Sequence, residues 1–226
     1  MTQPTATEDA LTTLIRSYVD FALESLPSMQ HPDGEFCFER RAGLPAPIGR
    51  SVRYTLMVEL GLLRARDAGY SVPVDLDALN EVAWRALGGT ALEPGDLGLM
   101  LWVESRRGGS RGEELAIRLE SALAVSGGLA GRLGMELGWI VTGLAHHVTA
   151  GGGETGRRLL AQALDQLLIV NRAPTGLIRH FGAQGRRRRF PNFATQIYSV
   201  LALAAVAGYG LDDRALPAAC ALADRL

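Results

Sequence analysis

The sequence alternates between two kinds of helical segment, and this alternation restricts the fold more than any other feature. Three segments place apolar residues at the three- and four-residue spacing of a one-sided helix: 75–87, 113–124 and 155–170. Four others are apolar on nearly every face: 51–68, 96–106, 134–148 and 193–208. A helix of the second kind has to be buried all round. The pattern therefore predicts an inner layer of buried helices backed by an outer layer of amphipathic ones.

The same pair of segments recurs along the whole chain. Comparable points, at Tyr54, Leu99, Gly138 and Tyr198, lie about 40 to 60 residues apart, near the period of two-helix repeats. Before them, a capping-box pattern at Thr5 and Glu8 opens a helix whose apolar face carries Leu11, Leu14, Ile15, Tyr18 and Ala22. We predict an all-α, two-layer α/α-hairpin array of about nine helices in a single domain, 1–226. An irregular helical bundle is the alternative.

Two long loops, 27–50 and 171–191, each lead into a buried helix. Both contain a turn sequence, Pro32-Asp33-Gly34 in the first and Pro174-Thr175-Gly176 in the second, followed by a short alternating run. In the second loop this run predicts a small β-hairpin. Because both loops precede inner helices, we expect them to lie on the same rim of the array. Long loops in compact domains are often functional.

The first loop carries a sequence motif. Leu26-x3-Gln30-x3-Gly34-x-Phe36 resembles the core of the QW motif of squalene–hopene cyclases and related terpenoid cyclases, with Phe in place of Trp, and Asn171 and Gly176 give a looser match. Together with the helix pattern, the chain resembles the α/α toroids of terpenoid cyclases, protein prenyltransferases and six-hairpin glycosidases, lyases and epimerases. A closed toroid of this kind has twelve helices. A chain of about nine helices would form an open ring, a ring that another chain completes, or a partial copy of a toroid.

The chain departs from those families at the residues that carry their chemistry. The acid motif Asp-x-Asp-Asp is broken at Asp75-Leu76-Asp77-Ala78, the aspartate-rich magnesium motif is missing, and Cys220 lacks the context of a zinc ligand. His146 and His147 are adjacent on a helix, about 100° apart, which does not suit one shared metal ion. We therefore predict neither a metal nor a cofactor.

The resemblance places the cavity where the inner helices begin, and this defines the candidate site. Glu39 and Glu136 are the candidate catalytic acid or base, which requires a raised pKa in a dry cavity. The candidate substrate-binding residues are Arg53, Tyr54, Trp139, Arg179, His180, Asn192 and Gln196. Tyr54 and Trp139 would stack on a ligand, and Arg53 and Arg179 would hold an anionic group. For each residue the alternative is a local structural role. Arg186–Arg189 are expected to be a solvated run.

Composition excludes several classes of function. The net charge of −1 argues against a nucleic-acid binder, and two cysteines are too few for a disulfide scaffold. All 23 basic residues are arginine, which excludes a Schiff-base lysine and indicates a GC-rich bacterial genome. The first residues have no secretory pattern, and the longest apolar run, Val200–Gly208, is too short to span a bilayer. We expect a cytoplasmic protein.

Three functions remain open, and whether the chain is an enzyme is one of the open points. The first is a toroid cavity protein that resembles terpenoid cyclases and prenyltransferases but lacks their acid and metal motifs. The second is a carbohydrate-handling toroid related to epimerases, lyases or glycosidases. The third is a non-catalytic scaffold that binds a partner, or a second copy, at its C-terminal edge. An aromatic, apolar cavity would favour an isoprenoid ligand, and a lining of carboxylates and amides would favour a sugar.

Overall fold

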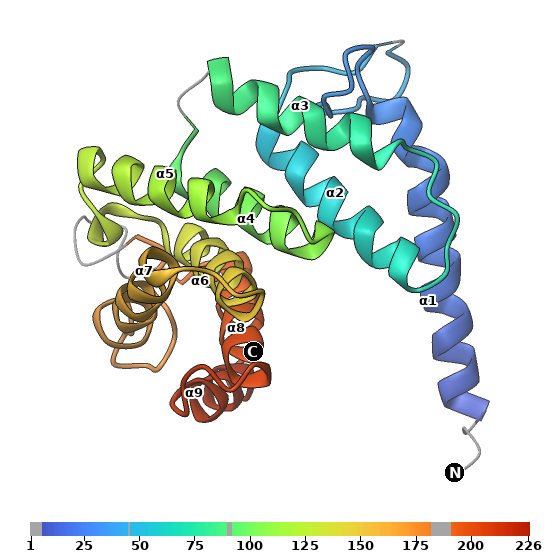
Figure 1. Ribbon diagram of the computed structural model, residues 1–226. Helices are drawn as coiled ribbons and strands as arrows, with labels where there is room; N and C mark the ends of the chain where they lie inside the picture. The colour runs from blue at the N-terminus through green and yellow to red at the C-terminus, as the bar shows by residue number, and fades with distance from the viewer. Residues whose placement is uncertain (1–5, 45, 90–91, 182–190) are drawn as a thin grey trace. The chain divides into compact units, whose positions relative to one another are not determined.

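The computed structural model describes residues 6–44, 46–89, 92–181 and 191–226, which form helices joined by turns (Figure 1). Within these ranges, extended pairing is limited to isolated antiparallel bridges, such as Gln30 with Phe36 and Arg172 with Ile178. The all-α class is therefore confirmed. Most of the predicted second-loop hairpin, and the run Arg186–Arg189, lie outside the described residues. The open or incomplete toroid stays a prediction.

Contacts divide the chain into two compact units, and each is described by itself. The first, residues 1–89, contains α1 (Ala6–Ser25), a 3-10 turn (Leu26–Met29), α2 (Val52–Asp67) and α3 (Leu76–Gly89). The second, residues 90–226, contains α4 (Pro94–Arg107), α5 (Gly112–Val125), α6 (Gly134–Thr149), α7 (Glu154–Asp165), α8 (Phe193–Gly208) and α9 (Ala215–Ala223). A 3-10 turn (Leu129–Gly131) precedes α6, and a π-helical turn (Gln166–Val170) extends α7. The single domain predicted above stays a prediction.

The second unit is built in two layers, as the hydrophobic pattern predicts. α6 lies between α4 and α8, while α5, α7 and α9 pack behind them (Figure 1). Glycines let the inner helices approach backbone to backbone. A Cβ on Gly98 of α4 would lie 2.7 Å from the Cα of Ile140 on α6, and one on Gly138 of α6 would lie 3.0 Å from the carbonyl oxygen of Tyr198 on α8. This close packing explains why α6 is buried on nearly every face.

Four helices end in the same turn, which closes four successive α/α hairpins. The glycines Gly69, Gly108, Gly151 and Gly210 follow α2, α4, α6 and α8, and all have positive φ, between 65° and 94°. After each one, the next amide donates to the carbonyl five residues back: Tyr70 to Ala65, Gly109 to Glu104, Gly152 to His147 and Leu211 to Val206. This is the Schellman arrangement, in which glycine avoids the Cβ penalty of left-handed backbone. The predicted hairpin repeat is therefore visible in the backbone itself.

The two long loops also share one turn. In the first, Cys37 N donates to Met29 O at 2.9 Å, and in the second Arg179 N donates to Asn171 O at 2.8 Å. Each turn contains a glycine with positive φ, Gly34 at 93° or Gly176 at 85°. Each is tied to the helix that follows: Phe36 N donates to Thr55 Oγ1 and Ile178 N to Gln196 Oε1, from equivalent positions of α2 and α8.

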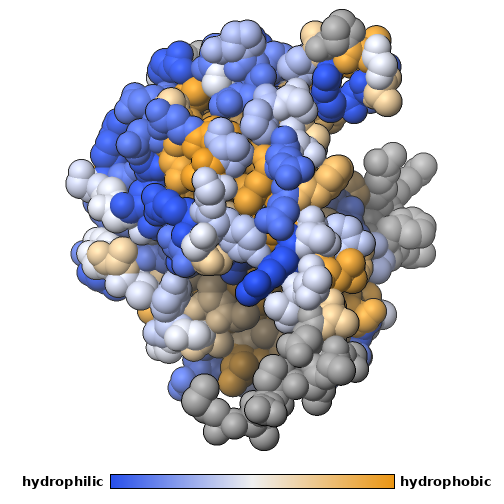
Figure 2. All heavy atoms as spheres, turned by 90° about the vertical axis from the view of Figure 1, so that its right-hand side faces the viewer, coloured by the Kyte–Doolittle hydropathy of each residue, from blue (hydrophilic) through white to orange (hydrophobic). Residues whose placement is uncertain are grey.

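The first unit differs from expectation on two helices. The apolar stripe of α1 is exposed: Leu11, Leu14, Ile15, Tyr18 and Phe21 are between 49% and 69% exposed. Figure 2, which faces the side where α1 lies, shows such apolar side chains at the surface. In addition, α2 is not buried all round, because Gly61 and Arg64 are exposed. Its buried residues include Leu56, Leu60 and Leu63.

Candidate functional site

Six predicted site residues come together in the second unit, around the first turns of α6 and α8. Glu136 and Trp139 lie on α6. Arg179 and His180 lie on the loop that precedes α8, and Asn192 and Gln196 lie at the start of α8. The loop is fixed against α6 because Gly134 N donates to His180 O at 2.7 Å. This loop therefore brings the six residues together at the starts of α6 and α8.

Four of the six have evident structural roles there. Asn192 caps α8 by accepting from Thr195 N at 3.3 Å. Gln196 is 2% exposed and bonds both backbone groups of Ile178, each at 2.8 Å. Trp139 is 1% exposed and packs edge-on against Tyr198. Arg179 donates to Val170 O at 3.1 Å.

Glu136 and His180 are the carboxylate and the imidazole of this rim. Glu136 is buried, and its Oε2 accepts from Leu133 N at 3.2 Å, which closes the first turn of α6. His180 Nδ1 lies 2.6 Å from Thr195 Oγ1. Burial lowers the pKa of His180, and the negative charge of Glu136 opposes that shift in part.

The three remaining predicted residues belong to the first unit. Glu39 forms an ion pair with Arg41 at 2.6 Å. The Tyr54 ring is partly exposed and lies 5.5 Å from that of Phe38, centroid to centroid. Arg53 is half-buried on α2. Their predicted roles toward a ligand stay predictions.

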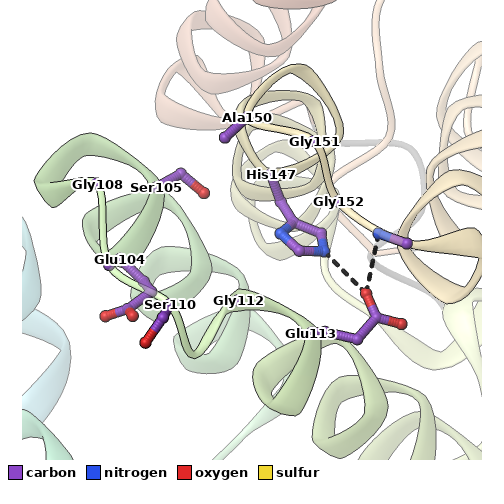
Figure 3. Close-up of a pocket in the computed structure, with 12 residues that line it drawn as sticks. Glu104, Ser105, Gly108, Ser110, Gly112, Glu113, His147, Ala150, Gly151 and Gly152 are labelled. Carbon is purple, nitrogen blue, oxygen red and sulfur yellow. Dashed lines mark hydrogen bonds and ion pairs between the residues drawn. The ribbon is translucent and has the colours of Figure 1, made fainter.

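A well-defined cavity lies elsewhere in the second unit, beside the turns that close the α4–α5 and α6–α7 hairpins. Its volume is about 480 Å³ (Figure 3). The wall holds two carboxylates, one imidazole, two hydroxyls and seven small residues: Glu104, Ser105, Gly108, Gly109, Ser110, Gly112, Glu113, His147, Ala150, Gly151, Gly152 and Gly153. Such a wall suits a polar ligand that exchanges hydrogen bonds.

Glu113 fixes the orientation of the His147 ring. His147 Nε2 lies 3.3 Å from Glu113 Oε2, which also accepts from Gly153 N at 3.0 Å (Figure 3). Burial alone would raise the pKa of Glu113, but the hydrogen bonds from Gly153, His147 and Thr155 outweigh it and lower the pKa. A carboxylate at this place holds the proton of neutral His147 on Nε2. The lone pair is then on Nδ1.

Nδ1 of His147 is directed to the cavity. In Figure 3 it points away from Glu113, to the side where Glu104 and Ser110 lie. Within the described ranges it has no hydrogen-bonding partner, although His147 is only 6% exposed. A buried imidazole nitrogen with an available lone pair is a competent hydrogen-bond acceptor or general base.

Glycines lie directly against the His147 ring and the Glu104 carboxylate. A Cβ on Gly112 would lie 2.6 Å from His147 Nδ1, and one on Gly152 would lie 2.6 Å from the same ring. A Cβ on Gly109 would overlap the Glu104 carboxylate. Any larger residue at these positions would displace the two functional groups or cover them.

The repeat shows that neither group is needed to close a hairpin. Glu104 and His147 each lie four residues before the glycine that ends their helix, and the corresponding residues of α2 and α8 are Ala65 and Val206. Val206 is fully buried, so an apolar residue serves the fold at this position. Sequence reasoning missed the pair, although aligning the helices on their terminal glycines would have found it.

His146, the neighbour of His147, takes part in a separate cluster. Its ring stacks on Trp102 of α4, with centroids 5.4 Å apart, and its Nδ1 lies 2.9 Å from the hydroxyl of Tyr209 after α8. No group of three His, Cys, Asp or Glu side chains suited to a metal ion occurs in the described part of the chain.

Among the helices described, none is long and apolar enough to cross a membrane. No family model, no curated protein and no solved structure matches this chain.

Proposed function

We propose that the second unit binds a small hydroxylated ligand of the carbohydrate type in the cavity beside His147. The observation that carries the proposal is the fixed imidazole, whose Nδ1 is turned into a cavity of about 480 Å³ while Glu113 occupies Nε2. A ligand hydroxyl would donate to Nδ1. Other hydroxyl groups of the ligand would form hydrogen bonds with Ser105, Ser110 and the backbone of the glycines that line the cavity.

The same geometry suits proton abstraction. When Nδ1 takes the proton of a ligand hydroxyl, or of an activated C–H, the imidazole becomes positive. The carboxylate of Glu113, already on Nε2, stabilises that charge. His147 is thus the candidate general base and Glu113 its positioning residue.

The lining of this cavity favours the carbohydrate hypothesis over the isoprenoid one. Its walls carry carboxylates and hydroxyls, and of the described residues that line it only Ala150 has an aliphatic side chain. An isoprenoid chain needs apolar or aromatic surface to offset its own burial. We propose that the fold is an incomplete α/α toroid, which the four hairpins with one common closing turn support. We also propose that the protein is cytoplasmic.

Titration calorimetry of the whole chain with neutral mono- and disaccharides and with isoprenyl diphosphates tests the proposal. We expect a sugar to release heat on binding and the diphosphates to release none. We expect the substitution His147→Asn to abolish the heat of sugar binding. His146→Asn is the matched control, because its ring faces Trp102 instead of the cavity. Sugar binding by His147→Asn with unchanged affinity, or binding of the diphosphates alone, would refute the proposal.

A second candidate function rests on the C-terminal edge. Leu216 of α9 is 60% exposed and Leu226 is 52% exposed, which favours a scaffold that binds a partner there. Light scattering tests this, because self-association at the edge would double the mass of 24.2 kDa and Leu216→Glu would restore the monomer. A monomer at all concentrations would count against self-association.

A further inference from the structure

The cavity wall carries negative charge, and none of its lining residues is an arginine. Glu104 and Glu113 both line it. Arginines lie nearby: Arg111 pairs with Glu114 at 2.9 Å, and Arg157 Nη1 donates to the carbonyl oxygen of Gly152 at 2.7 Å. Neither forms an ion pair with Glu104 within the described ranges, so a ligand can supply the positive charge that this carboxylate accepts.

Glu104 is the group that most needs such a partner. It is 5% exposed, and the bond it receives is from Arg111 N to Oε1 at 2.8 Å. It forms no ion pair within the described ranges. A buried carboxylate costs considerable free energy unless a cation or several donors compensate it. Since Ala65 and Val206 close their hairpins at the same position, hairpin closure does not require a carboxylate, and the bond from Arg111 N at the start of α5 occupies only one of its oxygens.

Two helices end and two begin at the cavity, so the helix ends do not set the sign of its potential. α4 and α6 finish there, while Gly112 and Glu113 at the start of α5 and Gly153, the N-cap of α7, also line it. Gly153 N donates to Glu113. Glu113 in turn is held by His147, which leaves Glu104 as the carboxylate available to a ligand.

We infer that the ligand carries a primary ammonium group beside its hydroxyls, as an amino sugar does. This rests on the proposed function. The ammonium group would donate to Glu104 while a hydroxyl donates to His147 Nδ1 on the other wall of the cavity. A neutral sugar would fill the same space without neutralising Glu104, and a sugar acid would be repelled by it.

Titration calorimetry of the full chain with five probes tests the inference: glucosamine, glucose, N-acetylglucosamine, glucuronate and ethanolamine. We expect glucosamine to bind at least tenfold more tightly than glucose or N-acetylglucosamine, and glucuronate not to bind. In Glu104→Gln the affinities for glucosamine and glucose should come within about twofold of each other, because the amide keeps the acceptor for Arg111 N. Glu114→Gln, outside the cavity, should keep the full preference.

The outcomes separate this inference from the proposed function. Equal binding of glucosamine, glucose and N-acetylglucosamine would overturn the ammonium inference and leave the carbohydrate site standing. Binding of ethanolamine but of no sugar would support the ammonium group and overturn the carbohydrate proposal. Absence of heat with all five compounds would overturn both. The comparison with N-acetylglucosamine uses the unmodified protein, so it holds even if Glu104→Gln fails to fold.

Discussion

The replacement of Gly98 by Ala tests whether the close approach of α4 and α6 holds the second unit together. The added methyl group would lie 2.7 Å from the Cα and 2.8 Å from the amide nitrogen of Ile140. Non-bonded carbon atoms settle at about 3.5–4.0 Å, so the contact is about 1 Å too short. Both atoms belong to the backbone of α6. The strain can be relieved only by moving a whole helix.

Two opposing contributions set the expected size of the effect. Alanine favours a helix over glycine by about 1 kcal/mol. Overpacking a rigid core costs typically 1–3 kcal/mol and sometimes more, and the backbone contact places this site at the upper end. We expect a net destabilisation of about 2 kcal/mol. For a chain of this length that lowers Tm by roughly 4–8 °C.

Calorimetric melting of Gly98→Ala beside Gly208→Ala measures the effect. Gly208 lies at the end of α8, and a Cβ there meets nothing within 4 Å, so its variant should melt at or slightly above the temperature of the unmodified protein. Equal Tm values for the two variants would show that α4 and α6 are not in backbone contact, which would refute the packing described above.

Three further predictions concern other parts of the chain. Gln196→Ala leaves both backbone groups of Ile178 without their partner, so urea unfolding should show a loss of about 2–4 kcal/mol, and an unchanged midpoint would contradict this role. Because the pKa of Glu113 is lowered in the folded state, its carboxylate stabilises the fold at pH values above the ordinary carboxyl pKa. This stabilisation is lost as the pH falls through the lowered pKa of the folded state. Glu113→Gln should therefore melt lower at neutral pH and show a flatter Tm profile toward acid, whereas a parallel profile would be evidence against it. Gly34→Ala and Gly176→Ala each place a Cβ on a residue with left-handed backbone, so each should lower the free energy of unfolding by about 1–2 kcal/mol in denaturant titrations. An unchanged free energy of unfolding would show that these turns are not formed.

The helices could be predicted from the sequence because the distribution of apolar residues along each segment shows which of its faces are buried. The segments 134–148 and 193–208 coincide with α6 and α8 to within a residue, since an inner helix is apolar on every face. Glu136, His180 and Gln196 lie near one another because the loop before α8 is bonded both to the start of α6 and to Gln196 of α8, but their role toward a ligand stays a prediction. The pattern was less informative for α2, whose Arg64 side is exposed.

The cavity could not be predicted in the same way, because it depends on which hairpins are neighbours. Hydrophobic periodicity shows which face of a helix is buried, but not that the turn after α4 lies beside the turn after α6. From the sequence alone, His147 is therefore only a possible metal ligand, and its place beside His146 argues against that role. Its partner Glu113 is 34 residues away in the sequence, and nothing in that spacing indicates a bond. The resemblance to toroid enzymes directed attention to the opposite ends of the inner helices.

The glycine contacts of α6 have a consequence for the timing of local opening. A helix enclosed by backbone on two sides opens only when its neighbours separate, so its amides should be among the last of the second unit to exchange with solvent. His147 lies near the end of this helix. The candidate base of the proposed site is therefore carried by the part of the second unit that should open last, and its position should outlast the local opening of the outer helices.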